Sequence, residues 1–192
     1  SIEQPLHPPR HAVAAALVPL YTFNYLNPES ARSNFRQSAV DSFWLTRIVR
    51  ESLEVPAEFS PTLAAIHFDG DRLGFFGHSQ GGLSGALAAA FEQNVDAWVL
   101  SAAGGIMAIT LVDRNDREYL TIRQLLLDES MLPQPNDVIT YLHPIATLVQ
   151  TLVDVADPIN YSPSWFAGTP RHSVLLTSGH HDQLTPHKAA DA

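Results

Sequence analysis

The sequence predicts an α/β fold in which parallel strands are flanked by helices. Two apolar segments rich in strand formers, 72–76 and 96–101, are separated by a segment of helix formers from 79 to about 93. A strand, a helix and a strand at this spacing predict a right-handed βαβ unit with parallel strands. A third segment of the same kind, 173–178, adds a strand to this sheet.

The composition fits one domain and excludes several classes of partner. The chain has 192 residues, enough for one sizeable core, and a net charge of −9 from 20 acidic and 11 basic residues. No run of lysine or arginine occurs, so nucleic acid is not an expected partner. The absence of cysteine excludes disulfides and thiolate metal sites. The apolar run 12–20 is too short to span a bilayer, so no transmembrane segment is expected.

The first third of the chain is expected to be mostly irregular, followed by one long helix. Five prolines interrupt residues 1–31, where we expect a short helical piece at 13–17 and a loop at 23–28. From 34 to about 53, apolar residues recur every three to four positions, which predicts an amphipathic helix. Its N-cap would be Ser33 or Asn34.

Residues 54–71 are predicted to form a polar connector that ends in a turn. The acids Asp69 and Asp71 stand on either side of Gly70 in this turn. A calcium loop is not expected, because the remaining spaced ligands and the final glutamate are missing.

No strand pattern occurs between residues 106 and 170. Two helices are predicted there, 117–129 and 137–155, separated by prolines. The second is apolar over more than half its circumference, so it needs a second surface to cover. It is either a lid over an apolar substrate pocket or a helix packed in the core, and the sequence leaves both open.

A glycine-rich motif lies between the first predicted strand and its helix. The pattern G-x-S-x-G between a strand and a helix is typical of a nucleophile elbow, a strained turn that presents a serine hydroxyl. We expect the two outer glycines to give the strand and helix room to approach. An ordinary turn that binds an anion at the helix N-terminus is the alternative; a P-loop lacks its G-K-[ST]. The motif consists of Gly77, His78, Ser79, Gln80, Gly81 and Gly82.

A carboxylate follows the third predicted strand. A nucleophilic serine needs a histidine to take its proton and an acid to orient that histidine. Asp182 lies at the same edge of the predicted sheet as Ser79, because the carboxyl ends of parallel strands meet there. The alternative is a turn or N-cap aspartate, and Asp154 and Asp157 are rival acids.

These segments resemble the α/β-hydrolase superfamily. The resemblance rests on residues 77–82 and 179–186, each directly after a predicted strand. More narrowly, residues 23–28 and 34–41 are similar to bacterial lipase-like and esterase-like hydrolases, which are often exported to the periplasm, the envelope or the medium. The similarity covers most of the chain from residue 5 onward.

The resemblance implies a serine hydrolase that cleaves small-molecule or lipid esters through an acyl-enzyme. Ser79 would attack, Asp182 would orient the base, and the backbone N–H of Gln80 would be one oxyanion donor. The resemblance implies no metal or other cofactor, and it makes residues 106–170 a helical, lid-like insertion. A peptidase or acyltransferase on the same scaffold, or a noncatalytic binding protein, is the alternative. The oligomeric state stays open.

Two parts of that family pattern are not found in residues 1–192. The second oxyanion donor normally precedes the elbow strand, and the catalytic histidine normally follows one more strand after the acid. We therefore expect an incomplete domain, cut at both ends, with little turnover of its own.

The histidines in the chain match that role poorly. His78 lies inside the motif, and His180 and His181 are too close to Asp182 in sequence. No third ligand is spaced to make these neighbours a metal site. His187 could swing back toward the serine, whereas His143 and His172 are expected on the surface or lid.

Overall fold

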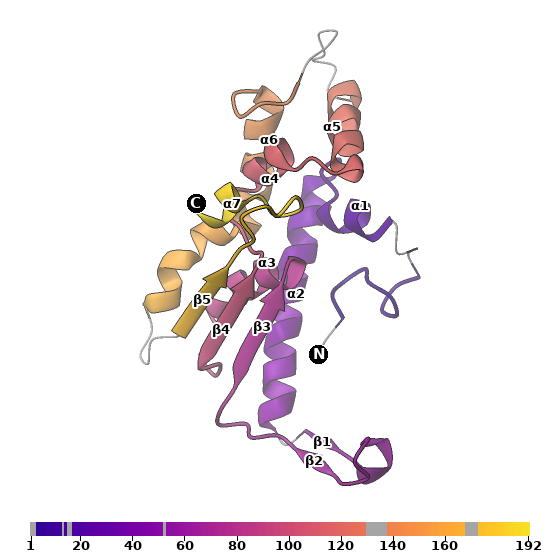
Figure 1. Ribbon diagram of the computed structural model, residues 1–192, viewed down its shortest axis with the longest axis vertical. Coiled ribbons are helices and arrows are strands. Elements are labelled where there is room, and N and C mark those ends of the chain that lie inside the picture. Colours follow the sequence, from indigo (N-terminus) through magenta and orange to yellow (C-terminus); the bar gives the residue numbers. More distant parts are fainter. Residues whose placement is uncertain (1–2, 13, 15–16, 52, 130–137, 168–172) are drawn as a thin grey trace.

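A parallel sheet of three strands forms the centre of the molecule. The computed structural model describes residues 3–12, 14, 17–51, 53–129, 138–167 and 173–192. The strands are β3 (Gly74–His78), β4 (Ala97–Ser101) and β5 (Ser173–Thr177), with β4 in the middle. Register pairs the carboxyl ends of all three, so the loops that follow them leave from one edge of the sheet (Figure 1). The predicted α/β class, with parallel strands and flanking helices, is confirmed.

One face of this sheet is covered by two helices. Helix α3 (Gln80–Ala89) connects β3 to β4, and helix α2 (Pro28–Arg50) packs against α3. Trp98 and Leu100 of β4 point into the core between the sheet and these helices and are at most 1% exposed. Alternate residues of each strand therefore face this core.

The start of α2 corrects the predicted helix start. The helix begins at Pro28, and the side chain of Asn27 accepts a hydrogen bond from the N–H of Ser30 at 3.2 Å. A proline is tolerated in the first turn, where its missing N–H would have no partner. The predicted cap at Ser33 or Asn34 is therefore wrong.

The expectation of irregular structure before that helix is also wrong in part. Helix α1 (Val18–Phe23) has Pro19 in its first turn, as α2 has Pro28. The helical piece expected at 13–17 falls mostly outside the described residues.

The connector between α2 and β3 contains two very short strands. β1 (Glu54–Val55) and β2 (Ile66–His67) pair antiparallel around the 3-10 helix η2 (Ala57–Phe59). The hairpin projects from the end of α2 that is remote from α4 to α6 (Figure 1). Strands of two residues carry too little alternation to be visible in a sequence pattern.

Three helices, α4, α5 and α6, form a second group beyond the carboxyl edge of the sheet (Figure 1). Their packing makes a second core that includes Leu111, Ile122 and Val149. Helix α5 has its predicted bounds, whereas α4 was not predicted and α6 begins at Pro144, later than expected. Proline again occupies a first helical turn. The bounds are α4 (Met107–Asp113), α5 (Arg117–Glu129) and α6 (Pro144–Val153).

The remaining elements are short. Three 3-10 helices follow α6, and one turn of α-helix, α7, follows β5. They are η3 (Asp154–Ala156), η4 (Pro158–Asn160), η5 (Ser162–Phe166) and α7 (His187–Ala190). Within the described part of the chain, no helix has both the length and the apolar character to cross a membrane.

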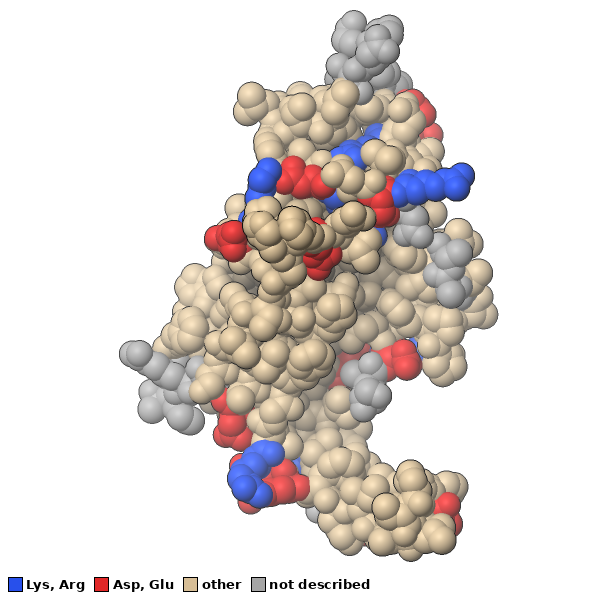
Figure 2. All heavy atoms as spheres, viewed as in Figure 1, with Lys and Arg blue, Asp and Glu red and all other residues tan. Residues whose placement is uncertain are grey.

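The second face of the sheet is exposed. Phe76 of β3 and Leu175 of β5 lie in one cross-strand row with Val99 between them, and they are 70% and 56% exposed. Figure 2 shows few charged side chains over this part of the surface. The sheet thus has one packed face and one uncovered apolar face.

Candidate functional site

Ser79 adopts a strained backbone conformation at the junction of β3 and α3. Its φ is 54° and its ψ is −117°, a region that residues other than glycine rarely enter. Such a conformation costs on the order of 1–3 kcal/mol and persists only where the surrounding structure enforces it. Here the N–H of Ser79 donates to the carbonyl of Ser101 at 2.8 Å, and its carbonyl accepts from Leu83 N–H at 3.0 Å. The turn is fixed between the sheet and the helix.

The glycines around Ser79 differ in why they are needed. A Cβ on Gly77 would lie 2.2 Å from the carbonyl oxygen of Gly81, and one on Gly82 would lie 2.9 Å from the carbonyl oxygen of Ser101. A Cβ on Gly81 would meet no atom within 4 Å. The expectation that Gly81 is needed for the close approach of strand and helix is therefore wrong. The second glycine at a close approach is Gly82.

Backbone donors converge next to Ser79. Gln80 is the first residue of α3, so its N–H and those of the next two residues have no acceptor within the helix. The positive end of the helix dipole adds to their attraction for negative charge. This arrangement can stabilise an oxyanion that forms next to the serine.

His78 lies on the uncovered side of the sheet. It is exposed, and its Nδ1 is 3.2 Å from the hydroxyl oxygen of Ser101 on the neighbouring strand. The sequence analysis expected the side chain of His78 to point away from the nucleophile, and its hydrogen-bond partner is this second serine.

A pocket of about 700 Å³ includes Ser79. Its walls come from the N-terminal segment, α1, α2, all of β3 and the first turn of α3, and two residues from distant parts of the chain, Arg114 and Leu184, complete it. The polar groups in the lining include Gln4, whose buried Oε1 has no partner within the described residues.

The loop that carries Asp182 reaches this pocket. The Oδ1 of Asp182 accepts hydrogen bonds from the N–H groups of Leu184 at 2.8 Å and Thr185 at 3.0 Å, and Leu184 lines the pocket. In the described part of the chain, Asp182 has no hydrogen bond to Ser79 or to a histidine. The structure thus brings the loop of the predicted acid to the serine pocket without joining the two side chains.

The rival acid Asp157 is fully engaged elsewhere. It is 0% exposed, and its carboxylate accepts from the N–H groups of Ile106 at 2.9 Å and Met107 at 2.7 Å, at the start of α4. Ile159 N–H and Gln150 Nε2 also donate to it, at 3.1 and 2.8 Å. This carboxylate fixes the start of α4 and has no free oxygen for a histidine.

The second rival, Asp154, is exposed in η3. Among the described residues, Gln150 Nε2 donates a hydrogen bond to its Oδ1 at 3.4 Å. Neither rival lines the pocket at Ser79.

Among the described residues, none of the histidines considered from the sequence is hydrogen-bonded to Ser79. The rings of His180 and His181 lie 4.8 Å apart and those of His180 and His187 lie 5.2 Å apart. His143 accepts a hydrogen bond from Ile145 N–H at 3.1 Å as the N-cap of α6, and His172 falls outside the described residues. Over the residues that the structure describes, no group of three or more potential ligands could hold a metal ion.

Sequence reasoning missed His7. It lines the same pocket as Ser79, and its Nδ1 lies 3.1 Å from the carbonyl oxygen of Pro5. A carbonyl can only accept, so Nδ1 is the donor and Nε2 of the neutral ring is left as a proton acceptor. A lone histidine among prolines gives no sequence signal of this position.

A buried polar cluster next to the pocket was also missed. Arg114 is 7% exposed, and its guanidinium carbon lies 3.9 Å from the ring centroid of Tyr119. The hydroxyl of Tyr119 donates to that of Tyr25 at 3.1 Å, and burial raises the pKa of Tyr119 to about 12. Burial also raises the pKa of Tyr25. These residues come from three segments, so no local spacing predicts the cluster.

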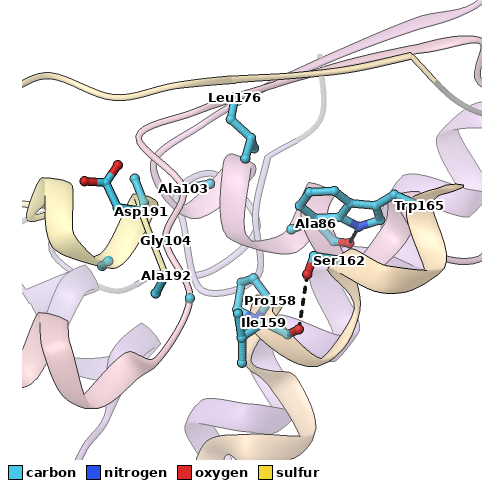
Figure 3. A pocket seen from close by; sticks show the side chains of 13 residues that line it. Ala86, Ala103, Gly104, Pro158, Ile159, Ser162, Trp165, Leu176, Asp191 and Ala192 are labelled. Atoms are coloured by element: carbon cyan, nitrogen blue, oxygen red, sulfur yellow. Dashed lines mark hydrogen bonds between the residues drawn. The ribbon is translucent and has the colours of Figure 1, made fainter.

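A second, smaller pocket lies on the other side of β4. It measures about 260 Å³, and alanine, glycine, proline and isoleucine make up most of its lining (Figure 3). Two of its polar side chains are already paired, because Ser162 Oγ donates to Ile159 O at 3.2 Å and Trp165 Nε1 to Ala86 O at 2.8 Å, and the lining also includes the carboxylate of Asp191. Of these two pockets, only the one at Ser79 is lined by a serine, a histidine and an arginine together.

We compared the chain with family models, with curated proteins and with solved structures, and none of the three comparisons found a match.

Proposed function

We propose that the protein is a serine hydrolase of carboxylic esters, of the lipase or esterase type, on an α/β-hydrolase scaffold. The observation that carries the proposal is the backbone of Ser79, with φ 54° and ψ −117° at a strand-to-helix turn in the wall of a pocket. A residue other than glycine keeps such strain where its placement serves a purpose. Here the strained serine lies in the wall of the pocket, directly after strand β3.

The reaction would pass through an acyl-enzyme. The hydroxyl oxygen of Ser79 attacks the ester carbonyl, and the negative oxygen that results accepts the N–H of Gln80 at the start of α3. Loss of the alcohol gives the acyl-enzyme, and water then releases the acid. One donor of this kind typically supplies about 3 to 4 kcal/mol of transition-state stabilisation.

The general base has two candidate sources. In the family pattern the histidine follows a further strand after Asp182, which would orient it. His7 is a source within the described pocket, since its Nδ1 donates to Pro5 O and its Nε2 is left to take a proton. The two sources can be told apart, because a His7 base can be tested directly in the 192-residue chain.

A noncatalytic binding protein is the second candidate function. It is favoured by one observation: no histidine in the described residues is hydrogen-bonded to Ser79 or Asp182. In that case the pocket would hold a ligand without cleaving it.

Labelling with a fluorophosphonate probe tests the proposal. The probe is applied to the 192-residue chain and to the protein as expressed from its own gene, each compared with Ser79→Ala. Ser33→Ala is the matched control, because Ser33 is exposed on α2 and donates to Glu29 O. The hydrolase is supported if the wild type and Ser33→Ala are labelled and Ser79→Ala is not. A folded protein that stays unlabelled in both forms supports the binding protein.

Two further variants identify the partners of Ser79. Asp182→Asn should lower ester hydrolysis by orders of magnitude if Asp182 orients the base. His7→Gln should also lower the rate by orders of magnitude if His7 is the base. If its rate stays within a few-fold of wild type, the histidine of the family pattern is the remaining candidate for the base. Circular dichroism confirms that each variant is folded.

A further inference from the structure

The pocket at Ser79 contains one side chain that is charged at neutral pH among its described lining residues. That side chain is Arg114, and no aspartate or glutamate shares the lining. The remaining walls are apolar or neutral, with Val18, Phe23 and Leu45 among them. A cation in such a wall favours a ligand with negative charge.

Arg114 is rigidly placed. It is the residue after the last turn of α4, its Nε donates to Asp116, and its guanidinium carbon lies over the ring of Tyr119, 3.9 Å from the ring centroid. Stacking and the ion pair fix a side chain that would otherwise lose much rotamer entropy on binding a ligand. The terminal nitrogens carry four more N–H donors in a planar fork, which matches the two oxygens of a carboxylate.

Asp116 forms an ion pair with Arg114 through the Nε side of the guanidinium. Its second oxygen accepts the N–H of Tyr119 at 3.4 Å in the first turn of α5, so the helix terminus shares this carboxylate. Burial by itself would raise the pKa of Asp116, but the hydrogen bond and the charge of Arg114 outweigh it and the pKa is lowered. Asp116 is thus a fixed anion beside Nε of Arg114, and it is not among the residues that line the pocket.

An unused donor lines the same pocket. Gln80 is 8% exposed, and its side-chain Nε2 is buried and has no hydrogen-bond partner within the described residues. A buried amide without an acceptor costs about 1–3 kcal/mol, and a ligand oxygen would remove that cost. Its backbone N–H is a separate group, at the start of α3.

We propose that this pocket selects esters that carry a carboxylate on the arm remote from the scissile bond. Arg114 and the side-chain amide of Gln80 are the specificity-determining residues. That the ligand is an ester which the protein cleaves rests on the proposed hydrolase function. Binding of the carboxylate depends on the pocket alone.

Paired substrates test the selectivity. Hydrolysis of p-nitrophenyl hemisuccinate and p-nitrophenyl butyrate is compared, since the two differ mainly in the terminal carboxylate. Arg114→Met should lower the ratio of their kcat/KM values about tenfold or more, through KM of the anionic ester, because the carboxylate loses a charge-assisted hydrogen bond. Arg114→Lys keeps the charge without the fork and should fall between, and Gln80→Met should lower the ratio several-fold while it keeps the backbone N–H.

Arg123→Met is the matched control. Arg123 donates to Leu111 O at 3.4 Å from α5 and lies outside the pocket at Ser79, so the ratio should stay at its wild-type value. If Arg114→Met fails to fold by circular dichroism, Arg114→Lys and Gln80→Met decide the test. An unchanged ratio in both would overturn the proposal.

A binding measurement separates the two proposals. Calorimetry with monomethyl succinate, methyl butyrate and inorganic phosphate is carried out on Ser79→Ala, with and without Arg114→Lys. The carboxylate site is supported if monomethyl succinate binds and Arg114→Lys weakens this binding, even if no ester is hydrolysed. Equal binding of phosphate points to a general anion site and overturns the carboxylate assignment, and ester hydrolysis without any preference for the anionic substrate overturns the selectivity alone.

Discussion

Ser101 holds the turn at Ser79 from the neighbouring strand. Its carbonyl accepts the N–H of Ser79 at 2.8 Å, and its hydroxyl oxygen lies 3.2 Å from Nδ1 of His78. One residue of β4 thus contacts two consecutive residues of the turn. The strain at Ser79 is therefore imposed by the sheet as well as by the glycines.

Glycine at position 79 should stabilise the fold. Ser79→Gly relieves a positive φ that both serine and alanine find unfavourable, so we expect it to be about 1–2 kcal/mol more stable than Ser79→Ala. Urea denaturation of the two variants measures the difference. At the exposed helical position Ser33, the same comparison should have the opposite sign, with glycine less stable than alanine by about 1 kcal/mol. Equal stabilities at position 79 would mean that the turn is unstrained.

Alanine at position 77 should be severely destabilising. Its Cβ would lie 2.2 Å from a backbone oxygen, and neither the strand nor the helix can move without the other. We expect a loss of about 3 kcal/mol or more, or failure to fold. Gly81→Ala is the control, because its Cβ meets open space in the first turn of α3, and it should change stability by no more than about 1 kcal/mol, on the favourable side. A well-folded Gly77→Ala variant would contradict the close approach.

Asp157 should matter for stability more than Asp154. Asp157→Asn turns an amide N–H₂ toward groups that are themselves donors, so we expect a loss of about 2–4 kcal/mol in the free energy of unfolding. Asp154→Asn changes an exposed side chain and should stay within about 0.5 kcal/mol. Thermal unfolding of both variants distinguishes them. If Asp157→Asn is neutral, the carboxylate does not hold the start of α4.

Stability should fall at high pH through the buried tyrosines. Burial raises the pKa of Tyr119 from 10.0 to about 12, so the folded state keeps a proton that the unfolded state releases. This contribution is complete below pH 10 and is lost as the pH rises from 10 toward 12, and it amounts to roughly 2–3 kcal/mol. Tm measured between pH 9 and 12 should fall less steeply in Tyr119→Phe than in the wild type. Tyr21→Phe, at an exposed position, is the matched control.

The parts of the fold that were predicted correctly are local in sequence. The βαβ unit and β5 are short apolar runs bounded by turns, and α5 has its own three-to-four periodicity. The start of α2 was misplaced because a proline in a first turn and one in a loop look the same in a sequence. The hairpin of β1 and β2 is too short to show a pattern.

Only those parts of the site that are close together in the sequence could be predicted. Ser79 and its neighbours form one motif, and the loop of Asp182 follows from the order of the strands. Arg114 and His7 join them through the packing of α1, α4 and the N-terminal segment, for which no spacing rule exists. The role of Asp157 was missed for the same reason, since its partners at the start of α4, Ile106 and Met107, lie 51 and 50 residues away in the chain.

The position of the Ser79 turn also leads us to expect an order of assembly. Strand β3, helix α3 and strand β4 form one uninterrupted segment, Gly74 to Ser101, and such local contacts form early because little chain entropy is lost in closing them. Arg114 and Leu184 can join the pocket only after α4 and β5 have docked. Amide hydrogens of the turn should therefore exchange with solvent by global unfolding, and those of the pocket walls by smaller and more frequent openings.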